Sequence, residues 1–269
     1  MTRLAVIAGQ GKIPVQIAET AVSMGYDVVV MPIRGQADAD FSAFASQPIA
    51  LGAIGGTLAL MQEQGCTHLV MAGKVVRPSL AALKPDASAV KLLGKAMMRG
   101  DDSLLRVISD FFAANGIETV APEDFMRDRL APVGLLAGRT PDTAQDEDIA
   151  LARRVLAALG ELDVGQAVVV QAGRVLAIEA AEGTNEMLRR VTGLVDAGES
   201  PAVMVKMPKS GQHMKLDMPV IGVATIESAA DASIGVIAVQ AGGVLFAEAA
   251  SVLSEAAEAL GVTLLGLRG

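Results

Sequence analysis

The first half of the chain alternates between two patterns of apolar residues. Short apolar runs bounded by glycine are typical of strands, and longer stretches with helical periodicity are typical of amphipathic helices. The apolar runs occur at residues 4–7, 26–31, 68–72 and 117–120, and the helical stretches at 14–24, 54–64 and 104–114. Because strands that alternate with helices pair in parallel through right-handed crossovers, we predict an α/β domain with a parallel sheet over residues 1–131.

The pattern changes after this domain. Residues 132–147 are rich in Pro, Gly, Thr and Asp, which predicts a linker, and a helical pattern resumes at 149–159. Two pairs of apolar runs flank glycine turns and predict two hairpins, 166–170 with 175–178 and 236–239 with 244–246. Hairpins mixed with helices indicate a C-terminal α/β domain with a mixed sheet over residues 148–269.

Apolar residues dominate the composition, although no apolar run is long. Hydrophobic residues make up 52% of the 269 positions and the mean hydropathy is +0.46. Glycine, proline or a charged residue interrupts every run well short of the roughly 20 residues that a membrane-spanning helix needs. We therefore attribute the apolar bias to strands that are buried on both faces, and to an apolar groove as a further use. Peripheral contact with the inner-membrane surface is left open.

The charge of the chain excludes one class of partner. The net charge is −8 and the isoelectric point is near 4.9, whereas a nucleic-acid-binding protein needs a basic surface. Only 3% of the residues are aromatic and none is Trp, so stacking on single strands is not expected either. A single cysteine, Cys66, cannot form an intramolecular disulfide, and the N-terminus has no signal-peptide pattern. We expect a cytoplasmic protein.

Two glycine loops of the N-terminal domain are candidates for ligand binding. Gly9-Gln10-Gly11-Lys12 follows the first predicted strand, and Gly73-Lys74 with nearby Arg77 follows a later one. Both loops lie at the carboxyl edge of a parallel sheet, where helix N-terminal amides bind phosphates. Pro14 occupies the position of the third glycine of the dinucleotide-binding fingerprint, so the loop is a weak signal. Tight-turn geometry and solvated cations are the alternative explanation.

Polar residues cluster in three segments of the C-terminal domain. We predict that Glu182 and Asp217 bind a metal ion or the attacking water, and that Lys206 and Lys209 neutralise a diphosphate. The residues predicted to orient the diphosphate are Gly183, Thr184, Asn185 and Gln212. Ordinary turn chemistry explains any one segment alone, but three together favour a site for a phosphorylated ligand held with Mg²⁺.

Several common catalytic schemes do not fit this sequence. Two histidines and one cysteine cannot build a multi-His zinc site, and neither a G-x-S-x-G nucleophile elbow nor a Walker A motif is present. What remains is a set of carboxylates, lysines and backbone amides. Such groups suit hydrolysis of a phosphoanhydride, which requires neutralised phosphate charge, an oriented water and a stabilised leaving group.

A series of motifs in a fixed order resembles a known family. The segments are Ile7 to Pro14, Met71 to Pro78, Asp163 to Val169, Glu182 to Thr184, Lys206 to Gln212, and Asp217 to Gly222. In this order and spacing they resemble the bacterial UDP-2,3-diacylglucosamine pyrophosphatases of lipid A biosynthesis, in the form unrelated to calcineurin-like phosphoesterases. The resemblance runs nearly from end to end.

The resemblance implies a fold, a substrate and a reaction. It implies a Rossmann-like N-terminal domain and a C-terminal domain that carries most of the catalytic groups, with an amphiphilic UDP-sugar lipid held between them. The reaction would be Mg²⁺-dependent hydrolysis to UMP and 2,3-diacylglucosamine 1-phosphate, by water attack on the sugar-side phosphorus. Thr225 would join the substrate-binding residues. Whether the chain forms a homodimer is left open.

Two positions depart from the family pattern. Asn185 stands where many relatives carry Asp, and Ala224 stands where an acidic residue is expected before Thr225. Loss of a metal- or water-binding carboxylate slows hydrolysis by orders of magnitude while it leaves binding largely intact. The sequence therefore also fits a non-catalytic lipid-nucleotide binding module. A dinucleotide-dependent oxidoreductase is a third hypothesis, against which Pro14 argues.

Overall fold

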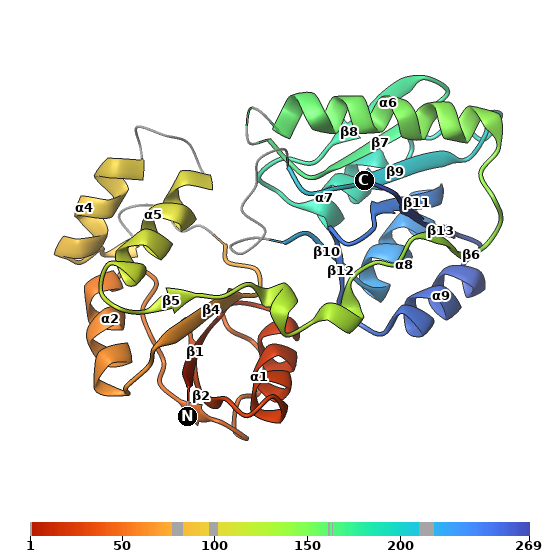
Figure 1. Ribbon diagram of the computed structural model, residues 1–269. Coiled ribbons are helices and arrows are strands. Elements are labelled where there is room, and N and C mark those ends of the chain that lie inside the picture. Colours follow the sequence, from red (N-terminus) through yellow and green to blue (C-terminus); the bar gives the residue numbers. More distant parts are fainter. Residues whose placement is uncertain (1, 77–82, 97–101, 161, 163, 210–217) are drawn as a thin grey trace. The chain divides into compact units, whose positions relative to one another are not determined.

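The computed structural model describes residues 2–76, 83–96, 102–160, 162, 164–209 and 218–269 (Figure 1). These residues form two compact units that meet in the chain between Met126 and Arg127. Arg77, Gln212 and Asp217, three of the predicted site residues, lie outside the described residues.

The first unit is built on a five-stranded parallel sheet with the order β3-β2-β1-β4-β5. Its strands are β1 (Arg3–Ala8), β2 (Asp27–Pro32), β3 (Ala45–Ser46), β4 (His68–Ala72) and β5 (Glu118–Thr119). Its helices are α1 (Ile13–Ser23), α2 (Ile54–Glu63), α4 (Ala87–Ala96), α5 (Asp102–Ala113) and the 3₁₀ turn η1 (Pro122–Asp124). This strand order is that of a Rossmann half-fold and confirms the prediction of a Rossmann-like parallel sheet.

The central strands of this sheet explain the uninterrupted apolar runs. β2 carries Val28, Val29, Val30 and Met31, all of them buried. The crossover helices of a parallel sheet cover both of its faces, so a central strand needs apolar residues at successive rather than alternate positions. β1 has the same character, and it pairs with β2 on one side and β4 on the other.

The second unit contains a six-stranded mixed sheet with the order β6-β13-β11-β9-β7-β8, and a two-stranded parallel pair, β10-β12. The strands are β6 (Gly134–Ala137), β7 (Ala167–Gln171), β8 (Arg174–Ile178), β9 (Ala202–Lys206), β10 (Val220–Ile221), β11 (Ile234–Gln240), β12 (Leu245–Phe246) and β13 (Thr263–Leu267). The helical elements are η2 (Arg127–Arg129), α6 (Thr143–Gly160), α7 (Thr184–Val191), α8 (Val223–Asp231) and α9 (Ala250–Ala259). The predicted mixed sheet is confirmed.

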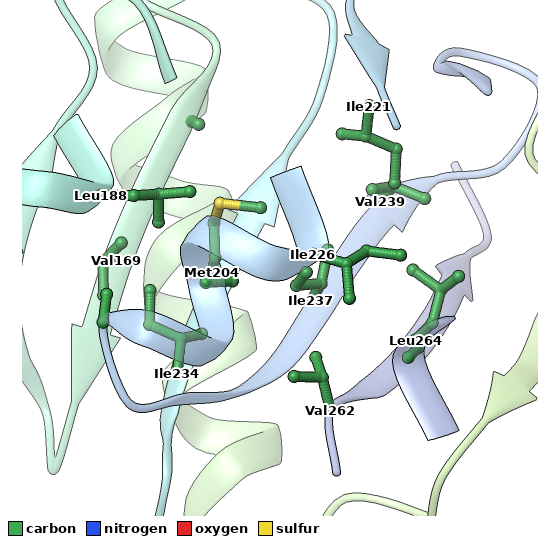
Figure 2. Close-up of a cluster of buried hydrophobic side chains, with 14 of the residues drawn as sticks. Val169, Leu188, Met204, Ile221, Ile226, Ile234, Ile237, Val239, Val262 and Leu264 are labelled. Atoms are coloured by element: carbon green, nitrogen blue, oxygen red, sulfur yellow. The ribbon is translucent and has the colours of Figure 1, made fainter. Parts of the chain in front are cut away.

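Helices cover both faces of the mixed sheet. Along β9, Val203 and Val205 pack with residues of α6, whereas Met204 packs on the opposite side with residues of α7 and α8. Figure 2 shows this second face, where Met204 and Ile237 lie close to Ile226 of α8. Because successive side chains of a strand point to opposite faces, the all-apolar strands divide their side chains between two cores.

The first predicted hairpin is confirmed, whereas the second is wrong. β7 and β8 pair antiparallel around Gly173, as predicted. The run at 236–239, however, lies in β11, which pairs in parallel with β9 and β13, and the run at 244–246 contains β12, which pairs in parallel with β10. Both edges of β11 are taken by neighbours, so the Gly242-Gly243 turn carries the chain away from the sheet instead of folding it back. A glycine turn marks a change of direction and does not specify which strand pairs next.

The segment predicted as a linker differs from that expectation. It contains β6, which is the edge strand next to β13, and the beginning of α6. Gly138 in this segment serves close packing: it has φ +76°, and a Cβ on it would lie 2.7 Å from Oγ1 of Thr263. Composition alone cannot separate a flexible connection from an edge strand whose backbone packs tightly.

No helix within the described ranges is long and apolar enough to cross a membrane.

Candidate functional site

The two glycine loops of the first unit lie side by side and contact each other through their backbones. The amide of Gly9 donates to the carbonyl of Ala72 (2.8 Å), and Gln10 and Lys74 exchange backbone hydrogen bonds of 2.8 and 3.1 Å. A Cβ on Gly9 would lie 2.6 Å from the Lys74 carbonyl oxygen, and one on Gly73 would lie 2.7 Å from the Gln10 carbonyl oxygen. Glycine is therefore required at both positions for the two loops to meet.

This contact occupies the place where α/β sheets commonly bind ligands. The strand order reverses between β1 and β4, and the crevice at the carboxyl ends of two such strands is the usual ligand site. Here the two loops are joined to each other at that edge by their own hydrogen bonds. The side chains of Lys12 and Lys74 stay exposed at the same edge of the sheet. The chemistry available at this edge is that of exposed cations.

The amide of Gly11, at the start of α1, already has an anionic partner. It donates to Oδ1 of Asp38 at 2.7 Å, so a carboxylate of the chain occupies a position that a phosphate would otherwise take.

A third loop joins the other two: the side chain of Gln36 donates to the Val76 carbonyl (2.9 Å) and accepts from the Val76 amide (3.1 Å). We call the loops 9–12, 33–38 and 73–76 the N-terminal rim.

The second unit holds a network of three side chains, which we call the Lys206 network: the buried Glu179 and Lys206 and the half-buried Thr184. Nζ of Lys206 donates to Oγ1 of Thr184 at 2.7 Å and lies 3.4 Å from Oε2 of Glu179. The Thr184 hydroxyl donates to Oε1 of Glu179 at 2.8 Å. Lys206 is 4% exposed and Glu179 is 8% exposed. Two opposite charges are therefore held together out of water with a hydroxyl between them.

Three elements and two glycines bring this network together. Lys206 is the last residue of β9, Glu179 directly follows β8, and Thr184 begins α7. A Cβ on Gly165 would lie 1.9 Å from the Glu179 carbonyl oxygen, so only glycine lets the chain pass there. Gly183 has φ +85°, which ends the turn after β8 and directs the chain into α7. Both glycines are in segments that the sequence analysis singled out.

The hydrogen atoms of the network can be counted. The Thr184 hydroxyl has one hydrogen, which goes to Glu179, and it accepts from Lys206. The Lys206 ammonium has three N–H groups, of which one goes to Thr184 and one to Glu179. For the third, no acceptor is found among the described residues. The network can therefore donate one further charge-assisted hydrogen bond.

Glu182 lies near this network in sequence but has a different partner. Its carboxylate forms an ion pair with Arg190, whose Nη2 also donates to the Ile178 carbonyl at 3.0 Å. A hydrogen bond from its own backbone amide, opposed by desolvation and reinforced by Arg190, lowers the pKa of Glu182. The carboxylate is thus ionised at neutral pH, as a metal ligand must be, and one of its oxygens is engaged by Arg190.

The N-terminus of α8 carries the position where an acidic residue was expected. Ala224 is exposed as the second residue of the helix, and Thr225 is buried with Oγ1 3.4 Å from the Gly222 amide, which donates to it. The Val223 amide donates to Oε2 of Glu248 at 3.2 Å. A carboxylate is therefore present at this helix start, but it comes from the loop after β12.

The structure brings some of the predicted site residues together and leaves others apart. Thr184 and Lys206 are in direct contact, and Gly9 and Gln10 contact Gly73 and Lys74. Asn185 is exposed as the second residue of α7, and Lys209 is half-buried three residues beyond β9.

Within the described part of the chain, no three His, Cys, Asp or Glu side chains are close enough to hold a metal ion.

Sequence reasoning missed Glu179 and Glu248. Glu179 directly follows the apolar run predicted at 175–178 and is flanked by Ile178 and Ala180. A charged residue inside an otherwise apolar segment is the signal that points to it, because Glu is almost never fully buried without a partner. Its partner Lys206 is 27 positions away and could only be found in the fold.

Comparison with known proteins gives matches over both units. The model of the "LpxI N-terminal domain" family matches residues 3–129, and that of the "LpxI C-terminal domain" family matches residues 132–265. The chain is 37% identical over 275 residues to UDP-2,3-diacylglucosamine pyrophosphatase LpxI of Caulobacter vibrioides, with 99% of this chain and 98% of that protein covered.

Two solved structures show only a remote likeness. Precorrin-6A reductase CobK is 15% identical with a TM-score of 0.35, over 100% of this chain and 88% of its own. UDP-glucose 4-epimerase of Thermus thermophilus, in complex with NAD, is 16% identical with a TM-score of 0.31. The match covers 99% of this chain and 86% of the epimerase chain. Scores this low support no inference about this chain.

Proposed function

Because this chain belongs to the LpxI family, we propose that it hydrolyses the diphosphate of UDP-2,3-diacylglucosamine, with UMP and 2,3-diacylglucosamine 1-phosphate as products. The observation that carries the proposal is the identity of 37% to a pyrophosphatase over 99% of the chain, with both family domains matched in order. The protein is accordingly a hydrolase that acts on a phosphoanhydride, and we place its reaction in lipid A biosynthesis.

The Lys206 network supports a role in holding the diphosphate. The remaining N–H of Lys206 is suited to a phosphate oxygen, and the first amides of α7, at Thr184 and Asn185, add donors at a helix N-terminus. Lys209 follows three residues after Lys206 and would contribute a second positive charge. In the first unit, we propose that the exposed Lys12 and Lys74 bind the anionic part of the substrate.

We propose Mg²⁺ as the cofactor, held by Glu182 and Asp217 with oxygens of the substrate. The charges of Glu179, Lys206, Glu182 and Arg190 cancel, so these four residues leave the charge of a diphosphate uncompensated. Mg²⁺ often binds through only one or two carboxylates plus substrate phosphates, so a preformed cage is not required. An ionised Glu182 fits that role. The ion would supply charge neutralisation of the two phosphoryl groups.

We further propose that hydrolysis is slower than in relatives with an acidic residue at position 224. Ala224 presents a methyl group at the exposed start of α8 and can neither orient water nor bind a metal. Replacement of Ala224 by Asp should raise the rate of UMP release by orders of magnitude. Equal rates for the two proteins would dismiss this part of the proposal.

The function is tested by UMP release from UDP-2,3-diacylglucosamine, measured by chromatography with and without EDTA. We expect turnover that EDTA abolishes and added Mg²⁺ restores. In water labelled with ¹⁸O, the label should enter 2,3-diacylglucosamine 1-phosphate and not UMP, because we propose attack on the sugar-side phosphorus. Turnover in the presence of EDTA would contradict the proposed Mg²⁺ dependence. Label in UMP would contradict attack on the sugar-side phosphorus. No turnover under any condition would contradict the proposed hydrolysis itself.

A non-catalytic lipid-nucleotide binding module is the second candidate, and Ala224 is the observation that favours it. Such a protein would bind the UDP-sugar lipid without hydrolysing it, even after Ala224 is replaced by Asp. A thermal shift with the substrate, together with the absence of UMP from both proteins, would select this function.

A further inference from the structure

Glu179 is a buried charged residue that the proposed reaction does not yet use. Its carboxylate is buried against three donors: the Thr184 hydroxyl at 2.8 Å, the Gln166 amide at 3.3 Å and Nζ of Lys206 at 3.4 Å. Its backbone is fixed as well, because its amide donates to the Ala167 carbonyl at 2.9 Å. The carboxylate therefore has little freedom to move.

Stability alone is a weak explanation for this arrangement. The removal of two charges from water costs several kcal/mol per ion, and well-packed apolar residues often replace a buried ion pair without loss. The surroundings offer such packing, since the neighbouring strands β7 and β9 consist almost entirely of buried apolar residues. The buried ion pair of Glu179 and Lys206 therefore calls for a role other than stabilising the sheet.

The direction of the hydrogen bonds indicates that role. An ionised carboxylate only accepts, so Glu179 draws the single hydrogen of the Thr184 hydroxyl to itself. The hydroxyl oxygen then faces Lys206 as an acceptor and binds one of its N–H groups at 2.7 Å. A second N–H of the ammonium donates to Glu179. Because two of its N–H groups are held, the ammonium cannot rotate, and the direction of its third N–H is fixed.

From this geometry we infer that Glu179 is a positioning residue for diphosphate binding. It acts through Thr184 and Lys206: it holds the ammonium at the end of β9 so that one N–H is directed to a phosphate oxygen of the nucleotide. Substrate and Glu179 do not touch. This inference rests on the proposed function, because the anion that Lys206 serves is the diphosphate of that substrate.

The test compares Glu179→Gln with a matched control, Asp148→Asn. Asp148 of α6 is also a buried carboxylate of the second unit, and it accepts from the amides of Ala172 and Gly173 at the opposite end of β7. Both substitutions remove a buried charge and keep the size of the side chain. The readouts are the melting temperature, kcat and KM for UMP release, and the affinity for UDP by calorimetry.

We expect Asp148→Asn to lower the melting temperature without changing UDP affinity or kcat of the folded protein. Glu179→Gln should weaken UDP binding and lower kcat/KM by about 100-fold, the scale of a binding group misplaced by about 1 Å. If both variants lose activity only in proportion to the unfolded fraction, and UDP affinity is unchanged in both, the inference is overturned.

A second variant decides the matter if Glu179→Gln does not fold. Glu179→Asp keeps the charge beside Lys206 but is one methylene shorter and cannot reach the Thr184 hydroxyl in the same geometry. A positioning role predicts a folded protein whose UDP affinity is reduced, by less than the ~100-fold expected for Glu179→Gln because the charge beside Lys206 is kept. Unchanged affinity in this folded variant would also overturn the inference.

The UDP measurement separates this inference from the proposed function. If the unaltered protein binds UDP but releases no UMP from the lipid substrate, the proposed hydrolysis fails, while the inference is judged by the UDP affinity of the Glu179 variants. If the unaltered protein hydrolyses the substrate and the variants bind UDP normally, the function stands and the inference fails. If the unaltered protein does not bind UDP, both fail.

Discussion

The N-terminal rim and the Lys206 network organise their polar groups in opposite ways. The rim is held by backbone hydrogen bonds between glycine loops, and its lysines project into solvent. The Lys206 network is held by side chains, and its charges are buried. Glycine backbone in the rim and side-chain chemistry in the network are therefore the features that substitutions should disturb most.

The largest effect is expected for Lys206→Met. It leaves the Glu179 carboxylate buried without its counter-charge, which costs about 3–5 kcal/mol of unfolding free energy, and it removes the proposed diphosphate ligand. UMP release should fall more than ~100-fold, which corresponds to roughly 3 kcal/mol of lost transition-state stabilisation. Chemical denaturation and a UMP assay measure the two effects.

The double variant with Glu179→Gln is the control for Lys206→Met, because it removes both charges. It should recover most of the stability and none of the activity. Recovery of activity in the double variant would show that Lys206 does not bind substrate.

The next effect is expected in the rim, for Gly73→Ala. The new Cβ would lie 2.7 Å from the Gln10 carbonyl oxygen in a residue with φ +87°, so we expect a loss of about 2–4 kcal/mol from steric overlap and backbone strain. The comparison is Gly25→Ala, which has φ +89° but open space around its Cβ and should cost about 1–2 kcal/mol. Equal losses in thermal unfolding would mean that the two loops do not require their close contact.

A smaller effect is expected when the exposed cations of the rim are removed. Lys12→Ala together with Lys74→Ala should change stability by less than ~0.5 kcal/mol, since exposed side chains contribute little to folding. KM for the substrate should rise several-fold at low salt and less at high salt, because salt screens exposed charges. Lys91→Ala, an exposed lysine of α4, serves as the control. The same rise in KM for the control would refute a local role of the rim.

The smallest effect concerns Arg190→Met and depends on pH. The pKa of Glu182 is below its ordinary value in the folded protein, so the stabilisation from this carboxylate is present above the ordinary glutamate pKa of about 4.3 and is lost as the pH falls through the lowered value. The melting temperature of the variant should be lower than that of the unaltered protein at pH 7, and the difference should shrink in acid. A difference that grows in acid would contradict this assignment.

Local patterns predicted the elements of the fold better than their partners. The apolar run at 26–31 and the helical stretch at 54–64 correspond to β2 and α2, because burial of a strand or of a helix face imposes a period on the sequence itself. The partners of β11 could not be predicted, since the choice between a hairpin and parallel neighbours depends on segments more than twenty residues away.

The candidate site shows the same difference. Thr184 and Lys206 were identified because they stand in polar, glycine-rich segments, but Glu179 lies beside an apolar strand and has no local signal of that kind. Gly9 and Gly73 were predicted as ligand contacts, with tight-turn geometry as the alternative. The structure adds a packing role for both that sequence spacing does not reveal. Long-range contact determined both outcomes.

The hydrogen bond from the Gly11 amide to Asp38 has a consequence for protein engineering. The Asp38 carboxylate lies at the turn between β1 and α1, so the phosphate of a nucleotide that bound there would have to displace it. A designer who wished to graft cofactor recognition onto this half-fold would begin by exchanging that aspartate for a small neutral residue, and only afterwards restore the glycine missing at position 14.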